Sequence, residues 1–326
     1  MRSLSFPVLA AIYWLSNLAL GFHIQEQQSK GYLAAVFKGD VPQVFFNLAP
    51  AATPSTFTAL NDGKAVLVPT KGTAGARDPF IVESQDGSKL FVLATDLDIR
   101  KTTWADAQTN GSRGVLVWES GDGVSWSGDG LIEVMPATAG YVWAPSAIWE
   151  VDKDQYAVFW SSRVYAASDT AHTGPAEGPL IYYSHTSDFK TFTAPARWNS
   201  DESATVIDQE IQHLGGRSYV RYLSDTDTVK RVVLDRSDTG LFGTWERIGV
   251  PVDQLREGPA LYRDLLRPQR YYLWEDNYGG AGYECYYTED FTVPYSPCDP
   301  GLTPTGMRHG AVVQIDNSSY AKLAGS

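Results

Sequence analysis

The strongest constraint on the fold of this chain is a weak internal repeat of short strand-like segments. Each copy has a strand, a small or polar residue, an acidic residue and then an aromatic side chain. The copies centre on Asp122, Asp188, Asp238 and Asp290, at spacings of 66, 50 and 52 residues, and a degenerate copy covers residues 47–57. Periods near 50 residues with several strands are typical of β-propellers. We therefore expect an all-β fold, a five-bladed β-propeller with four-stranded antiparallel blades; an irregular β-sandwich is the alternative.

The rest of the sequence agrees with a single all-β domain. Short runs of β-branched and aromatic residues recur between Gly, Asp, Asn and Pro, as in residues 89–94 and 155–160, and helical periodicity is scarce. No Pro/Ser-rich stretch or charge block marks a linker. We expect residues 22–326 to form one propeller domain after a signal peptide at residues 1–21.

The signal peptide is inferred from the first 21 residues. A short basic start containing Arg2 precedes a mostly apolar run from Leu4 to Leu20, and Ala19, Leu20 and Gly21 provide small residues for cleavage. The predicted location is therefore secreted and extracellular. The alternatives are an N-terminal strand or helix, or an uncleaved anchor.

The net charge limits the partners. The chain carries a formal charge of −12, and removal of Arg2 with the leader leaves −13. Nucleic-acid phosphates require a basic surface, so nucleic acid and anionic membranes are disfavoured. We expect a monomer with an uncharged or weakly charged substrate.

Two cysteines and two sequons fit an exported chain. Cys285 and Cys298 are the only cysteines, and in an oxidising compartment we expect them to pair rather than remain free thiols. Asn110 and Asn317 each begin an Asn-X-Ser sequon, which predicts glycosylation.

Three acidic residues stand at similar places in the predicted blades. Asp78, Asp208 and Glu257 each precede a short apolar run that is followed by an aromatic strand. In a propeller, equivalent positions of the innermost strands face one another across the central channel, so we expect these carboxylates to converge. Two carboxylates across a scissile bond are the minimum equipment of most glycoside hydrolases. Ordinary turn acids are the alternative for Asp78 and Glu257, and Glu210 is the alternative to Asp208.

Short motifs in this order make the chain similar to glycoside hydrolase family 43, over nearly all of residues 22–326. The motifs are Arg77-Asp78-Pro79, Trp143-Ala144-Pro145, Ile207-Asp208, Glu257-Gly258-Pro259 and Arg308-His309-Gly310. The resemblance implies a five-bladed propeller and an inverting mechanism. It assigns Asp78 as general base, Glu257 as general acid, and Asp208 as the residue that positions the acid and raises its pKa.

Further residues are candidates for substrate binding. The resemblance places His309 near the channel, where it would contact substrate or hold an ion or water. Trp143 offers an aromatic face, Arg77 adjoins Asp78, and Tyr278 lies in a Gly-rich loop. Ser146 departs from the family, whose members usually have an acid there, so sugar specificity is in doubt. We expect no required cofactor, no catalytic metal, and at most a structural ion near His309.

Several functions remain open. An invertase-type hydrolase would share Arg77-Asp78-Pro79 and a Glu-Cys pair, but Glu284-Cys285 is 206 residues beyond Asp78, too far for that family. A sugar-binding propeller without catalysis, or a protein-interaction propeller, is the non-enzymatic alternative. The sequence predicts a secreted inverting α-L-arabinofuranosidase acting on cell-wall polysaccharides, with β-xylosidase and galactofuranosidase activities as alternatives.

Overall fold

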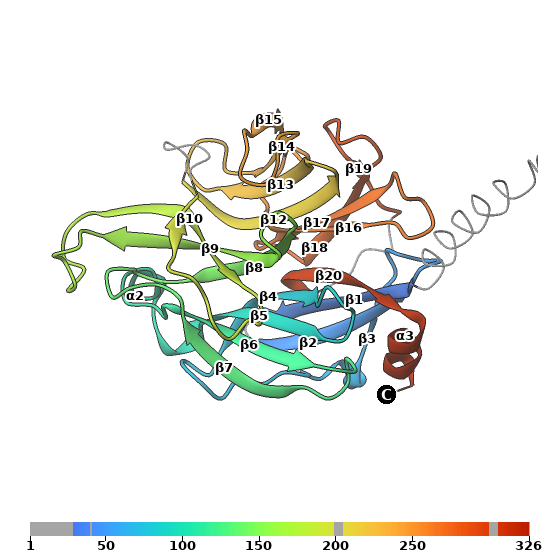
Figure 1. Cartoon of the computed structure of the whole chain (residues 1–326), viewed down its shortest axis with the longest axis horizontal. Helices are drawn as coiled ribbons and strands as arrows, with labels where there is room; N and C mark the ends of the chain where they lie inside the picture. The colour runs from blue at the N-terminus through green and yellow to red at the C-terminus, as the bar shows by residue number, and fades with distance from the viewer. Residues whose placement is uncertain (1–28, 40, 199–204, 300–305, 326) are drawn as a thin grey trace, which may run out of the picture.

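The computed structural model describes residues 29–39, 41–198, 205–299 and 306–325. The predicted signal peptide lies outside the described residues. The described strands form five separate four-stranded antiparallel sheets arranged in a ring (Figure 1). The predicted five-bladed β-propeller is confirmed.

Each blade is one sheet, the blades are numbered in chain order, and the strand named first for each blade below lines the hub. Blade 1 contains β20 (Arg308–Asp316), β1 (Ser29–Lys38), β2 (Val41–Pro50) and β3 (Thr58–Ala59). Blade 2 contains β4 (Ala76–Glu83), β5 (Leu90–Asp96), β6 (Gly114–Ser120) and β7 (Ser127–Glu133). Blade 3 contains β8 (Trp143–Glu150), β9 (Gln155–Tyr165), β10 (Ala176–Thr186) and β11 (Ala196–Arg197).

The last two blades follow the same order. Blade 4 contains β12 (Val206–Gly215), β13 (Ser218–Asp225), β14 (Val232–Ser237) and β15 (Glu246–Gly249). Blade 5 contains β16 (Glu257–Arg263), β17 (Tyr271–Asn277), β18 (Gly282–Thr288) and β19 (Ser296–Pro297). The described helices are short: η1 (Asn61–Gly63), η2 (Ile99–Lys101), α2 (Trp104–Thr109) and α3 (Asn317–Ala324). None of the helices in the described ranges has the length and apolar character needed to cross a bilayer.

The ring is closed by joining the two ends of the chain in one blade. β20, the last strand, pairs antiparallel with β1, the first, so that blade 1 takes its innermost strand from the C-terminal end. β20 also contacts the inner strands β4 and β16 of the two neighbouring blades. This closure brings His309 of β20 to the hub.

The repeated acidic element is a turn between the third and fourth strands. In blade 3, the Thr186 hydroxyl accepts the Phe189 N–H at 2.9 Å, and Asp188 accepts the Lys190 and Thr191 N–H groups at 2.8 Å. Serine, threonine and aspartate stabilise turns in this way. In the same blade Phe189, directly after Asp188, is buried against Phe91 of blade 2 and Tyr156 of blade 3. In blade 3 the repeated element thus forms the turn and supplies a contact between blades.

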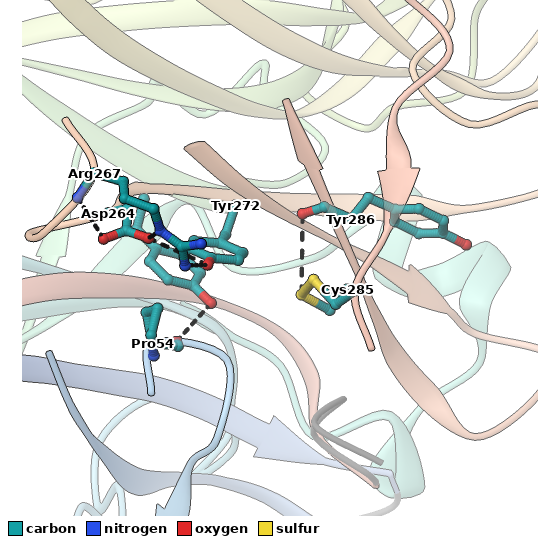
Figure 2. Close-up of a disulfide and its surroundings, with 8 residues drawn as sticks. Pro54, Asp264, Arg267, Tyr272, Cys285 and Tyr286 are labelled. Atoms are coloured by element: carbon teal, nitrogen blue, oxygen red, sulfur yellow. Dashed lines mark hydrogen bonds and ion pairs between the residues drawn. A yellow bond between two sulfur atoms is a disulfide. The ribbon is translucent and has the colours of Figure 1, made fainter. Parts of the chain in front are cut away.

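The two cysteines connect β18 to the segment of β19. Cys285 and Cys298 form a disulfide with a Cα–Cα distance of 5.3 Å, which confirms the predicted pairing. Figure 2 shows this disulfide near the hydrogen bonds among Asp264, Arg267 and Tyr272 of blade 5. The bridge lies in the outer part of blade 5 and stabilises the short outermost strand.

Candidate active site

A β-bulge interrupts the inner strand of every blade at the same level. In β4, Arg77 pairs with Thr95 and Phe80 pairs with Leu93, so that two residues of β4 stand opposite one residue of β5. Such bulges change the direction of a side chain. The bulged residues with positive φ are Asp78 (48°), Ala144 (50°), Asp208 (54°) and Gly258 (56°), and the register of β20 shifts at His309.

The bulge corrects one expectation from the sequence. Asp78 and Asp208 occupy equivalent positions, but Glu257 is one residue earlier, because Gly258 takes the bulged position in β16. A Cβ atom on Gly258 would lie 2.6 Å from His309 Cγ, so no other residue fits there without displacement. Glu257 instead matches Arg77 and Trp143, each the last residue before its bulge.

Side chains on the second strands of blades 2, 4 and 5 connect to the bulge of the next blade. The Thr95 hydroxyl donates to Asp78 Oδ2 at 2.9 Å and accepts the Ala144 N–H at 2.7 Å. Ser224 similarly accepts the Gly258 N–H at 3.2 Å. In blade 5, Asp276 accepts the His309 N–H at 3.1 Å. These bonds fix the inner ends of the blades relative to one another.

These linking residues were not predicted from the sequence. Thr95, Ser224 and Asp276 each lie opposite the last residue before a bulge, Arg77, Ile207 and Glu257 respectively. The available signal was a polar residue near the end of each apolar second strand. Recognising these polar residues as links between blades would have required knowledge of the strand register.

His309 lies between the two equivalent carboxylates. Its Nδ1 atom is 3.5 Å from Asp78 Oδ1 and 3.9 Å from Asp208 Oδ1. The side chains of these three residues are only 14%, 16% and 9% exposed, respectively. Two carboxylates and one imidazole therefore share a small, largely buried volume at the hub.

The charges in this cluster decide its protonation. Burial would lower the pKa of His309, but the charges of Asp208 and Asp78 raise it to about 9. Burial would raise the pKa of Asp78, but the hydrogen bond and the positive charge of His309, with Arg77 and Thr95, lower it. At neutral pH, Asp78 is a carboxylate beside an imidazolium.

Asp208 differs from Asp78 in its pKa and its partners. Burial and the charge of Asp78 raise the pKa of Asp208, although His309 opposes the shift. Its Oδ2 atom accepts the Gly258 N–H at 3.1 Å and the Ser224 hydroxyl at 3.3 Å. Asp208 therefore holds the backbone immediately after Glu257.

Glu257 is a carboxyl group that retains its proton at neutral pH. Burial, followed by the charges of Asp208 and Asp276, raises the pKa of Glu257 to about 8. Arg308 Nη2 lies 4.0 Å from Glu257 Oε1, but Arg308 Nε is bonded to Asp276 at 2.7 Å. The site thus combines an ionised acid, Asp78, with a protonated acid, Glu257.

Glu210 is a further buried carboxyl group whose pKa is affected by the charge of His309. Its side chain is buried, and burial raises the pKa of Glu210 to about 8, while His309 and the Leu261 N–H act in the opposite direction. The structure therefore places a second neutral carboxyl group two residues beyond Asp208.

Glu210→Gln should stabilise the protein in alkaline solution. Between pH 4.5 and about 8 the folded state retains a proton on Glu210 that the unfolded state has released, so stability falls as pH rises. Glutamine removes this loss, and we expect a gain of about 1–3 kcal/mol in unfolding free energy at pH 8.5 and little change at pH 4.5. Urea unfolding of the wild type and the variant between pH 4.5 and pH 8.5 measures this difference in unfolding free energy. The exposed Glu246→Gln is the matched control, and a gain that does not vary with pH would contradict the assignment.

The other predicted residues occupy different parts of the site. Trp143 is partly buried and stacks on Tyr141 at 4.1 Å, and Arg77 lies over the Phe37 ring at 4.3 Å. Ser146 is 4% exposed, and its hydroxyl has no hydrogen-bond partner among the described residues. Tyr278 is 48% exposed in the turn after β17. Their roles in substrate binding stay predictions.

The predicted ion and glycans also stay predictions. Among the described residues, no group of three or more His, Cys, Asp or Glu side chains could hold a metal ion. Asn110 and Asn317 are both exposed, which is compatible with glycosylation at either sequon.

Comparison with known proteins identifies similar domains. A family model described as a probable glycosyl hydrolase domain, Glyco_hydro_43_rel, matches residues 27–321. An α-L-arabinofuranosidase of Bifidobacterium longum subsp. longum is 38% identical over 176 residues, which cover 50% of this chain and 16% of that protein. The chain therefore spans only a small part of this curated relative.

Two solved structures have the same fold at low identity. An exo-β-1,3-galactanase of Phanerochaete chrysosporium, solved with β-1,3-galactotriose, has a TM-score of 0.50 and 12% identity, covering 88% of this chain and 54% of that chain. The catalytic domain of a GH62 α-L-arabinofuranosidase from Coprinopsis cinerea has a TM-score of 0.50 and 13% identity, covering 74% of each chain. These likenesses support the propeller fold.

Proposed function

Because this chain belongs to the family of probable glycosyl hydrolase domains related to glycoside hydrolase family 43, we propose that it is a secreted inverting glycosidase that removes α-L-arabinofuranosyl residues from cell-wall polysaccharides. The observation that supports the mechanism is that one carboxyl group at the hub is ionised while another is protonated at neutral pH. Asp78 has a lowered pKa and Glu257 a pKa raised to about 8. Paired carboxyl groups with separated pKa values are the usual arrangement of a base and an acid.

In this mechanism Asp78 is the general base. Its carboxylate accepts a proton from a water molecule, which attacks the anomeric carbon from the face opposite the leaving group. The Thr95 hydroxyl and His309 orient the carboxylate. His309, as an imidazolium, also keeps Asp78 ionised.

Glu257 is the general acid. It donates its proton to the glycosidic oxygen as the bond to the anomeric carbon breaks, and the product has inverted configuration. Asp208 acts on Glu257 in two ways: its charge raises the pKa of Glu257, and its bond to the Gly258 N–H positions the adjoining backbone. Asp208 is therefore a positioning residue.

The sugar is assigned from the relative and from the resemblance. The similarity to the bifidobacterial α-L-arabinofuranosidase covers half of this chain, and it favours an arabinofuranosyl group over β-xylosyl or galactofuranosyl groups. The apolar run at residues 4–20 and the acidic net charge of −12 support secretion as a soluble protein. The disulfide between Cys285 and Cys298 suits the same oxidising environment.

A panel of glycosides tests this proposal. Arabinofuranosides, β-xylosides, galactofuranosides, arabinan and arabinoxylan are incubated with the wild type and with Glu257→Gln. We expect the wild type alone to release arabinose from arabinan and arabinoxylan, and ¹H NMR of the first-formed product should show inverted configuration. Glycan binding without hydrolysis by either protein would instead indicate a sugar-binding propeller, and retained configuration would exclude the inverting mechanism.

The pH profile should respond in opposite directions to two substitutions. For the wild type, kcat/KM should fall above about pH 8 as Glu257 loses its proton, and in acid as Asp78 gains one. Asp208→Asn removes a negative charge near Glu257 and should move the alkaline limb down by about one pH unit. His309→Gln removes a positive charge and should move both limbs up. Equal profiles for the three proteins would contradict this assignment of charges.

A further inference from the structure

Two tryptophans form an aromatic corner beside the catalytic hub. Trp104, the first residue of α2, lies 6.1 Å from the ring of Trp143 with the planes at 80°. Trp143 is in turn stacked on Tyr141. The guanidinium carbon of Arg77 is 5.5 Å from the Trp104 ring centre. The side chain of Trp104 is 51% exposed, which is unusual for so large an apolar residue.

The segment that carries Trp104 is firmly held. The buried Asp98 accepts hydrogen bonds from Arg100 Nε at 2.7 Å and Nη2 at 2.9 Å, and the Thr103 hydroxyl accepts the Asp106 N–H at 3.1 Å as an N-cap. At the other end of α2, His172 lies 2.6 Å from the Thr109 carbonyl. The first two contacts stabilise the conformation of the segment itself, and the His172 contact joins it to a distant part of blade 3, so that the exposed indole is preorganised.

The register of the inner strands shows where Trp143 and Arg77 lie relative to Glu257, the proposed general acid. Arg77, Trp143 and Glu257 are each the last residue before a bulge, and each pairs with an equivalent residue of its second strand. They therefore occupy the same level of the hub, one residue before the bulged position that Asp78 occupies. A general acid contacts the oxygen between the released sugar and the leaving group. The leaving group consequently departs at the level of Arg77 and Trp143.

We infer that Trp104 and Trp143, with Arg77, bind the leaving-group side of the substrate, a neutral sugar ring of the polysaccharide main chain. The inference rests on the proposed glycosidase function and adds the residues that recognise the polymer. The indole of Trp104 provides an apolar face for the ring, and Arg77 provides donors for its hydroxyl groups. A cavity of about 270 Å³ also borders Trp143, with Asp106, Lys101 and Thr102 among its lining residues. It adjoins the corner and has space for a substituent of that ring.

The test compares substrates with and without a leaving-group sugar. Trp104→Ala is assayed on an arabino-oligosaccharide or arabinoxylo-oligosaccharide that the wild type cleaves, and on the methyl glycoside of the released sugar. We expect kcat/KM to fall about tenfold on the oligosaccharide, mainly through KM, and to change less than about twofold on the methyl glycoside. Trp104→Phe keeps an aromatic face and should recover most of the loss.

Two controls separate binding from folding. Phe242→Ala removes a partly exposed ring from the turn between β14 and β15 and should leave both rates unchanged. Thermal unfolding checks that Trp104→Ala is folded, and Trp104→Phe tests the same contact if it is not. Equal losses on both substrates, or no loss on either, in an active enzyme would overturn this inference alone. A wild type that cleaves no glycoside would overturn the proposed function and this inference together.

Discussion

Glu257→Gln should lower kcat on oligosaccharides by about 10³–10⁴-fold, because the glycosidic oxygen then leaves without a proton. The need for that proton depends on the leaving group. On a dinitrophenyl glycoside or a glycosyl fluoride, whose leaving group is stable as an anion, the same variant should retain most of its activity. Steady-state kinetics on the two substrate classes measure the difference. The alkaline limb of the pH profile, which reflects the pKa of Glu257 at about 8, should also disappear.

The result has a matched control within the chain. Glu246 is exposed on β15, and Glu246→Gln changes the net charge equally without touching the hub. It should behave as the wild type on every substrate. If Glu257→Gln lost the same factor on activated and unactivated substrates, Glu257 would not be the acid.

Asp78→Asn should reduce hydrolysis to near the limit of detection, a loss of about 10⁴-fold or more on every substrate, because no group remains to deprotonate the attacking water. An activated leaving group should not restore activity, which distinguishes this variant from Glu257→Gln. Azide, a nucleophile that needs no deprotonation, should restore turnover and form a glycosyl azide of inverted configuration. Product analysis by NMR detects it.

A structural effect of Asp78→Asn can be recognised separately. Asparagine keeps an acceptor for the Thr95 hydroxyl but removes the negative charge beside His309. The pKa of His309, raised by Asp208 and Asp78 to about 9 in the wild type, should therefore fall in the variant, as measured by NMR titration. Restoration by activated substrates instead of azide would reverse the roles proposed for Asp78 and Glu257.

The fold was predictable because local chemistry repeats along the chain. Turns such as those at Asp122, Asp188 and Asp290 form outer hairpins through side-chain bonds to nearby backbone N–H groups, and their spacing is readable without coordinates. The pairing of Cys285 with Cys298 was equally predictable, since the chain has no other cysteines. The closure of blade 1 by β20 involves residues at opposite ends of the sequence and left no local signal.

The candidate site was only partly predictable. Short motifs predicted Asp78, Asp208, Glu257 and His309 as site residues, and the structure places the first two beside His309. Trp104 was missed because its loop has no repeated counterpart, and its relation to Trp143 exists only after the blades are assembled.

The amino-acid sequence by itself determined the blade count and the disulfide, since these depend on local patterns and on which residues are present. The tertiary structure decided which acid is charged. Protonation of Asp78, Glu257 and His309 depends on burial and on charges that come from four different blades, and both depend on distances across the ring rather than along the chain.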